Sequence, residues 1–180
     1  MRRRRRGLCV AIRDPRDAVT SLMLYQRFTF EPALDWVARS ARFCGERAGD
    51  EGALLLRYES GFTDDAATLD LIAAAMGVGL AAENRARIFA ANQRAAVEAA
   101  IGALPALPTA VRHAPSGDIY DPQTQWHAHH AGRSGEIGRW RGMLRARQVR
   151  AVEAELSEFM QRFGYFTPPL FATGVRLTGC

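Results

Sequence analysis

Charged residues gather where a short apolar run gives way to a helical pattern, in AIRDPRDAVTS at residues 11–21. Arg13 directly follows the apolar run, and Ser21 lies about two helical turns beyond Asp14, so it faces the same way as the helix start. A helix start favours anions, and a guanidinium binds a phosphate through paired hydrogen bonds. The spacing therefore indicates a phosphate site made by Arg13 and Ser21. Spacing alone leaves open the alternative that Arg13 only pairs with Asp14 or Asp17.

The same stretch carries the signals of a helix start. Asp14 is predicted to be the N-cap, Pro15 fits the first helical position, and Asp17 follows the cap by three residues. We expect a helix over residues 15–28 and, before it, a strand at GLCVAI (7–12) that is covered on both faces. Ligands of open α/β sheets lie beyond the carboxyl ends of the strands, which is where this junction falls.

The rest of the chain alternates helical and apolar patterns. ALLLRY (53–58) predicts a second buried strand, and the prolines and glycines of residues 104–122 predict a loop. The order strand, helix, helix, strand, helix is typical of an α/β fold with a parallel sheet. Further helices are expected from Pro32 to Gly45–Gly49, across TDDAATLDLIAAAMG up to Gly77, over residues 81–103, and across QVRAVEAELSEFMQRFG at 148–164.

Three of these helices show an apolar face. On the helix that ends at Gly77 it consists of Leu69, Ile72, Ala73 and Met76. On the last helix, the glutamates at 153, 155 and 158 fall away from that face and are predicted to be solvated. The expected core residues are Leu34, Val37, Ala41 and Cys44 on the second helix, and Val149, Val152, Leu156, Phe159, Met160 and Phe163 on the last one.

Two further segments join the first in a known pattern. Tyr58 ends the second strand and so points to the same sheet edge as Arg13, and RSGEIGRWR occupies residues 133–141. RDPRDAVTS resembles the 3′-phosphate-binding segment of cytosolic-type sulfotransferases, which use 3′-phosphoadenosine 5′-phosphosulfate (PAPS). RSGEIGRWR is similar to the late loop of that family, RKGxxGxWK, and LLLRYES to its YED strand end. The likeness covers about residues 8 to 165.

The resemblance implies a fold, a reaction and a set of site residues. The fold would be a three-layer, P-loop-NTPase-like parallel sheet flanked by helices, lacking its first strand and P-loop, with residues 8–166 as the domain between a basic segment (1–7) and a tail (167–180). The reaction would move a sulfuryl group from PAPS to a hydroxyl or amine of a small acceptor, without a metal. The nucleotide-binding residues would be Arg13, Ser21, Arg133, Ser134 and Gly135 at the 3′-phosphate and Tyr58 at the adenine.

Several departures from the family pattern bear on catalysis. The phosphosulfate loop and its lysine are absent, the sequence contains no lysine at all, and every histidine follows the RDPRD segment, whereas the family's catalytic histidine precedes it. Ser60 replaces an aspartate, Ser134 and Arg141 replace lysines, and Gly142 replaces an asparagine. An alternative is therefore a degenerate or truncated member that binds the nucleotide without catalysis. A member without its first strand should also expose an apolar sheet edge that promotes aggregation.

Composition indicates the class of protein and the charge of its ligand. The chain has 180 residues, 48% of them hydrophobic and 24% charged, which is typical of one globular domain. A net charge of +5 favours an anionic ligand. A basic nucleic-acid-binding module is another alternative, but the arginines are scattered and match no helix-turn-helix or zinc pattern. We therefore expect no nucleic-acid partner.

Cysteines and apolar runs bear on location. The three cysteines are far apart in sequence, which favours reduced thiols and a cytoplasmic protein. No run approaches the length of a membrane span. MRRRRR resembles the start of a signal peptide or a basic arm, but the apolar run after it is too short for a signal core, so we expect a solvated start.

WHAHH supplies the cluster His127, His129 and His130. Such a cluster can bind zinc, yet His127 and His129 diverge on a helix, and Asp118 or Asp121 would have to complete the ligand set. The alternative is a polar loop that leads into GRSG, near the acceptor.

Overall fold

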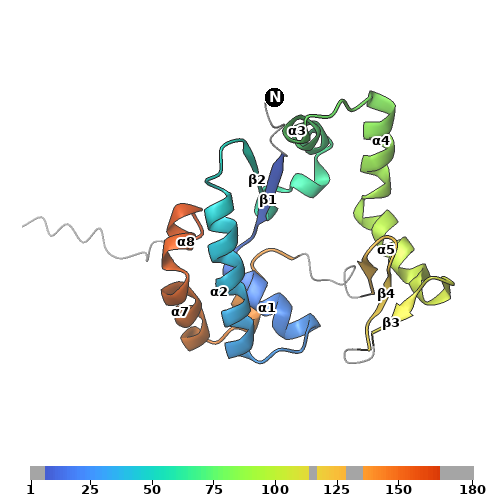
Figure 1. The fold of residues 1–180 in the computed structure, drawn as a ribbon. Helices are drawn as coiled ribbons and strands as arrows, with labels where there is room; N and C mark the ends of the chain where they lie inside the picture. Colours follow the sequence, from blue (N-terminus) through green and yellow to red (C-terminus); the bar gives the residue numbers. More distant parts are fainter. Residues whose placement is uncertain (1–6, 114–116, 129–135, 167–180) are drawn as a thin grey trace, which may run out of the picture.

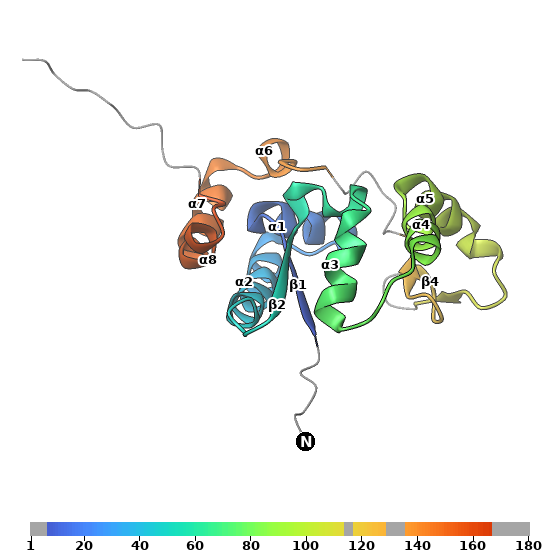
Figure 2. The ribbon, with the colours of Figure 1, turned by 90° about the horizontal axis from the view of Figure 1, so that it is seen from above.

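Two parallel strands form the centre of the fold (Figure 1). β1 (Leu8–Ile12) pairs with β2 (Ala53–Arg57), with Leu8 opposite Ala53 and Ile12 opposite Arg57. This computed structural model describes residues 7–113, 117–128 and 136–166. Two helices connect the strands, α1 (Pro15–Tyr25) and α2 (Phe30–Arg47). Seen from above, α2 lies on one side of the strand pair and α3 (Ala67–Met76) on the other (Figure 2).

The signals predicted for the start of α1 and the end of α3 hold, whereas α1 ends at Tyr25 rather than near residue 28 and α2 begins at Phe30 rather than at Pro32. The Asp14 side chain accepts a hydrogen bond from the backbone N–H of Arg16 at 2.9 Å, which makes Asp14 the N-cap of α1, and Pro15 is the first helical residue. Gly77 ends α3 in the left-handed conformation at φ 67°. Two 3-10 turns follow β2 directly, η1 (Tyr58–Ser60) and η2 (Phe62–Asp64).

The hydrophobic core lies between β1, α1, α2 and the last two helices. These are α7 (Ala146–Glu155) and α8 (Ser157–Arg162), where one continuous helix was expected. The break falls at Leu156, but the hydrogen bond from the Leu156 N–H to the Val152 carbonyl and that from the Met160 N–H to the Leu156 carbonyl keep the axis continuous. The faces expected on α2 and on the last helices are confirmed, since all ten residues belong to or pack against one cluster that includes Val10, Ile12, Val19, Ala33, Ala38, Leu144 and Tyr165. The stripe expected on α3 is confirmed only in part, because Ala73 is buried but 59% of Met76 is exposed.

A second group of elements lies at the opposite end of the molecule from α7 and α8 (Figure 2). The single helix expected over residues 81–103 is wrong, because the chain breaks at Asn92 and Gln93. The loop expected over residues 104–122 is also partly wrong, because it contains a 3-10 turn and two strands of an antiparallel sheet. The elements are α4 (Ala82–Ala91), α5 (Arg94–Ala103), η3 (Leu104–Ala106), β3 (Val111–Arg112), β4 (Ile119–Asp121) and β5 (Trp126–His127).

The α/β class is confirmed in its coarse form. The described residues contain one parallel strand pair and one three-stranded antiparallel sheet, so the large parallel sheet expected from the resemblance is not seen in these ranges. Within the same ranges no strand joins either outer edge of the β1–β2 pair. The expectation of buried strands covered on both faces is wrong, because Cys9 and Ala11 on β1 are exposed and 41% of Leu55 is exposed on β2. No helix in the described part of the chain is long and apolar enough to cross a bilayer.

Candidate functional site

Arg13 lies at the carboxyl end of β1, beside two of its expected neighbours. Its guanidinium stands 4.7 Å from the centre of the Tyr58 ring, and its Nη2 atom donates a hydrogen bond to the carbonyl of Glu136 at 3.1 Å. The same Nη2 atom is 4.0 Å from a carboxylate oxygen of Asp17. Contacts to Tyr58 and Glu136 show that Arg13 does more than pair with Asp14 or Asp17. The structure thus brings together parts of all three segments that the sequence singled out.

Ser21 opens onto the same pocket as Arg13. Both residues line a cavity of about 340 Å³ between β1, α1 and α2. This volume lies within the range of small-ligand sites. The apolar part of the wall includes Ala11, Ala18 and Leu22. The expectation that Ser21 and Arg13 face one space is therefore met, while their binding of a phosphate stays a prediction.

The carboxylate of Asp17 joins the start of α1 to the segment before α6 (Trp140–Met143). One oxygen accepts the backbone N–H of Gly138 at 2.6 Å, and the other accepts the backbone N–H of Trp140 at 3.0 Å. Gly138 has φ +80°, a conformation that favours glycine and that turns both N–H groups to the same side. Asp17 itself is 2% exposed. The sequence indicated Asp17 only as part of a helix start, but its carboxylate binds the backbone of a segment more than 120 positions away.

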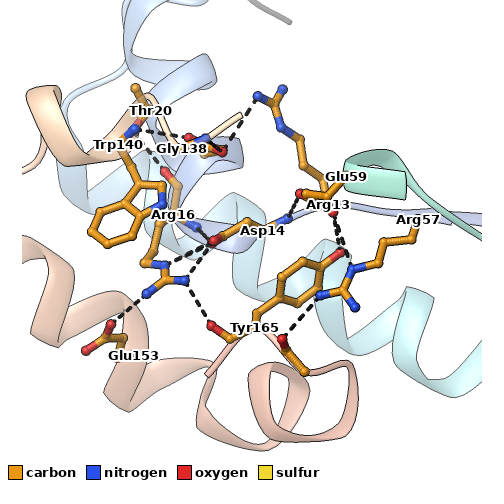
Figure 3. Close-up of polar contacts among 12 residues, drawn as sticks. Arg13, Asp14, Arg16, Thr20, Arg57, Glu59, Gly138, Trp140, Glu153 and Tyr165 are labelled. Atoms are coloured by element: carbon orange, nitrogen blue, oxygen red, sulfur yellow. Dashed lines mark hydrogen bonds and ion pairs between the residues drawn. The ribbon is translucent and has the colours of Figure 1, made fainter. Parts of the chain in front are cut away.

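Arg16 is buried at the centre of a charged junction, by which we mean the contacts among Arg13, Asp14, Arg16, Asp17, Arg57, Glu59, Glu153 and Tyr165 (Figure 3). The sequence did not reveal this role of Arg16. Its guanidinium donates to the Asp14 carboxylate at 2.8 Å, to Glu153 at 2.9 Å and to the Tyr165 carbonyl at 2.9 Å. It also stands 4.1 Å from the centre of the Trp140 ring. Burial lowers the pKa of the guanidinium, but the bonds to both carboxylates outweigh this effect and leave the pKa raised.

The expectation that the glutamates of the last helices are solvated is wrong for Glu153, because its side chain is the partner of Arg16. Glu155 pairs with Arg42 of α2 at 2.8 Å on the surface. No local pattern separates a glutamate that faces water from one that meets a buried arginine.

Glu59 closes the junction from the β2 side. It accepts the backbone N–H of Asp14 at 2.7 Å and the hydroxyl of Tyr165 at 2.9 Å. Asp14 and Glu59 each lie two residues beyond Ile12 and Arg57, the last pair of the parallel register, so the chain leaves both strands side by side at this point. Burial raises the pKa of the Tyr165 hydroxyl well above its usual value, and the negative charge of Glu59 is the second largest cause of this rise.

The raised pKa of Tyr165 predicts a loss of stability at alkaline pH. Above about pH 10 the unfolded chain releases this proton and the folded chain keeps it, so the free energy of unfolding falls by up to about 1.4 kcal/mol per pH unit. No lysine titrates in this range. Between pH 9 and pH 11.5, the melting temperature of the wild type should fall more steeply than that of Tyr165→Phe. Parallel curves for the two proteins would contradict this assignment.

Four carboxylates meet three guanidiniums at the junction: those of Asp14, Asp17, Glu59 and Glu153, and those of Arg13, Arg16 and Arg57. The carboxylates of Asp14, Asp17 and Glu59 all have partners within the protein, in Arg16, in two backbone N–H groups and in Tyr165. The exposed fraction of the Arg13 side chain is 22%, and Arg13 borders the pocket. An anionic ligand is compatible with this arrangement, because these carboxylates have partners within the protein and a cationic residue, Arg13, borders the pocket.

Several predicted residues lie outside the described part of the chain. They are Arg133, Ser134 and Gly135 of the late segment, and His129 and His130 of the histidine cluster. The Nδ1 atom of His127 lies 2.6 Å from a carboxylate oxygen of Asp118, and the His127 ring stacks on Tyr120. Within residues 7–113, 117–128 and 136–166, no three histidine, cysteine or acidic side chains are grouped to hold a metal ion.

Comparison with known proteins gives a likeness to solved structures. No protein-family model and no curated protein matches the sequence. Among solved structures, the fold is similar to that of the mouse sulfotransferase SULT7A1, whose crystal structure is a complex with PAP, at a TM-score of 0.59 and 16% identity. The match covers 89% of this chain and 60% of that chain, so this chain spans less than two thirds of the sulfotransferase. At this identity the likeness establishes that the chain has a sulfotransferase-like fold.

Proposed function

We propose that this chain binds PAPS and its product 3′-phosphoadenosine 5′-phosphate (PAP) as the nucleotide-binding part of a sulfotransferase. The observation that carries the proposal is the meeting of Arg13, Tyr58 and the segment at Glu136 beyond the carboxyl ends of two parallel strands. The similar fold of a sulfotransferase that binds PAP supports it. The three-layer, P-loop-like arrangement, the domain at residues 8–166 and a cytoplasmic location belong to the same proposal.

Each residue has a chemical role in this proposal. Arg13 binds the 3′-phosphate through its guanidinium, Ser21 donates its hydroxyl to the same group, and Tyr58 contacts the adenine. Arg133, Ser134 and Gly135 complete the phosphate site. Sulfuryl transfer resembles phosphoryl transfer in depending on position and charge, so a metal is not required in the proposal.

A second candidate is a protein that binds the nucleotide without transferring the sulfuryl group. The sequence holds no lysine, and no histidine stands ahead of Arg13. Incubation with labelled PAPS and a panel of phenols, alcohols and amines separates the two candidates. Transfer of label to an acceptor supports the enzyme, and nucleotide binding without transfer supports the binding protein.

Calorimetric titration with PAP tests the proposal shared by both candidates. We expect saturable binding of one nucleotide per chain, and a rise in melting temperature that corresponds to about 2.7 kcal/mol when PAP is at one hundred times its Kd. Duplex DNA serves as a control, because a basic protein that binds any polyanion would bind it with a steep dependence on salt. Absence of PAP binding, or DNA binding as tight as PAP binding, would overturn the proposal.

A further inference from the structure

The carboxylate of Asp17 is placed between two parts of the proposed site without reaching the pocket wall. Its two oxygens accept the backbone N–H groups of Gly138 and Trp140, and 1% of its side chain is exposed. The residues that line the pocket beside Arg13 do not include it. Asp17 is thus shielded from a ligand and bound to the backbone of the late segment.

These two bonds fix the chain that holds Arg13. Glu136 is two residues before Gly138, and its carbonyl accepts the hydrogen bond from Arg13. The Asp17 carboxylate is also 4.0 Å from the same Nη2 atom. Asp17 therefore affects the position of the Arg13 guanidinium in two ways. It fixes the segment that carries the Glu136 carbonyl, and its carboxylate attracts the guanidinium directly.

We propose that Asp17 is a positioning residue that gives the site its preference for nucleotides carrying a 3′-phosphate. The inference rests on the proposed function, in which Arg13 binds that phosphate. Asp17 holds the late segment against α1, and the segment in turn holds the Arg13 guanidinium in one orientation. A preorganised guanidinium loses less freedom when the phosphate arrives, so affinity for the phosphate is higher.

Charge repulsion alone predicts that the phosphate binds more tightly when Asp17 loses its charge. A carboxylate within a few ångströms of a phosphate site repels the ligand, so its removal alone should strengthen binding. Asp17→Asn removes the charge and also breaks one of the two contacts, because the amide oxygen can still accept one N–H whereas the amide nitrogen is a donor and cannot accept the other. If Asp17 positions Arg13, Asp17→Asn weakens binding of the 3′-phosphate. If charge repulsion alone matters, the same substitution strengthens it.

The test compares PAP with adenosine 5′-phosphate, which lacks the 3′-phosphate, by calorimetric titration. For Asp17→Asn we expect PAP affinity to fall by about tenfold, the effect of losing a charge-assisted hydrogen bond, while affinity for adenosine 5′-phosphate is unchanged. A general loss of folded protein would instead reduce the bound fraction for both nucleotides alike. Asp35→Asn is the matched control, because Asp35 pairs with an arginine on α2 and 67% of its side chain is exposed.

A second variant keeps the charge. Gly138→Ala should weaken PAP selectively as well, because alanine rarely adopts the φ of +80° that directs the Gly138 N–H to the carboxylate. Hydrogen exchange at the amides of Gly138 and Trp140 should be faster in both variants than in the wild type. If wild type binds PAP and Asp17→Asn binds it equally well or more tightly, the inference is wrong. If wild type does not bind PAP, the proposed function itself is wrong.

Discussion

Replacing Arg16 by methionine should lower the free energy of unfolding by about 3 to 5 kcal/mol, the usual cost of removing one partner from a buried ion pair. Methionine keeps an unbranched apolar stem of similar length, but the carboxylates of Asp14 and Glu153 lose their shared cation. The Tyr165 carbonyl and the Trp140 ring also lose their partner. A loss of this size is a large fraction of the stability of an ordinary domain, and urea denaturation measures it.

The matched control is Arg39→Met on α2. Arg39 also pairs with a carboxylate, that of Asp35 at 2.8 Å, and lies over the Trp36 ring at 5.6 Å, but 63% of its side chain is exposed. Its replacement should change the free energy of unfolding by about 0.5 kcal/mol or less. Arg16→Lys should restore only part of the loss, because an ammonium cannot reproduce the planar fork. Equal losses in the two methionine variants would show that burial of the Arg16 network contributes nothing.

Arg13→Ala should reduce the affinity for PAP by about thirtyfold to a hundredfold, since it removes a charge-assisted contact with the 3′-phosphate. Affinity for adenosine 5′-phosphate should change much less. The Arg13 side chain is 22% exposed, and the buried ion pairs of the junction are made by Arg16, so the variant should stay folded. Titration calorimetry with both nucleotides gives the ratio of the two affinities, which is the quantity that the prediction concerns.

Arg85→Ala is the control for a general effect of positive charge. Arg85 pairs with Asp70 on the surface, with 42% of its side chain exposed, and belongs to α4. If both variants lose the same affinity, the protein attracts the nucleotide by net charge rather than at Arg13. If neither loses affinity, the phosphate is bound elsewhere and the proposed site is wrong.

The start of α1 could be predicted from the sequence because its signals are local. Asp14 caps the helix and Pro15 begins it, and both act within a few residues. The apolar faces of α2 and of α7 and α8 were equally accessible, because a period of 3.6 residues needs no knowledge of the partner. The position of Ser21 relative to Arg13 followed from the same period and from the length of two helical turns.

Other features were beyond such reasoning for physical reasons. β3 and β5 each have two residues, too few to show alternation, so the expected loop concealed a sheet. The side chains of Arg16 and Glu153 look like surface charges in the sequence, and only the tertiary structure turns them into a buried pair. Asp17 fitted the pattern of a first helical turn, but its carboxylate faces another segment.

The distances along the chain at this junction also bear on the order of folding. Arg16 meets Glu153 and Tyr165 across 137 and 149 residues, and Asp17 meets Gly138 across 121. Contacts that span most of a chain close large loops and therefore form late. During synthesis β1 and α1 therefore emerge before the partners of Arg16 and Asp17, and the charged groups of these two residues stay hydrated until then. The junction is complete only when nearly the whole described chain has folded around it.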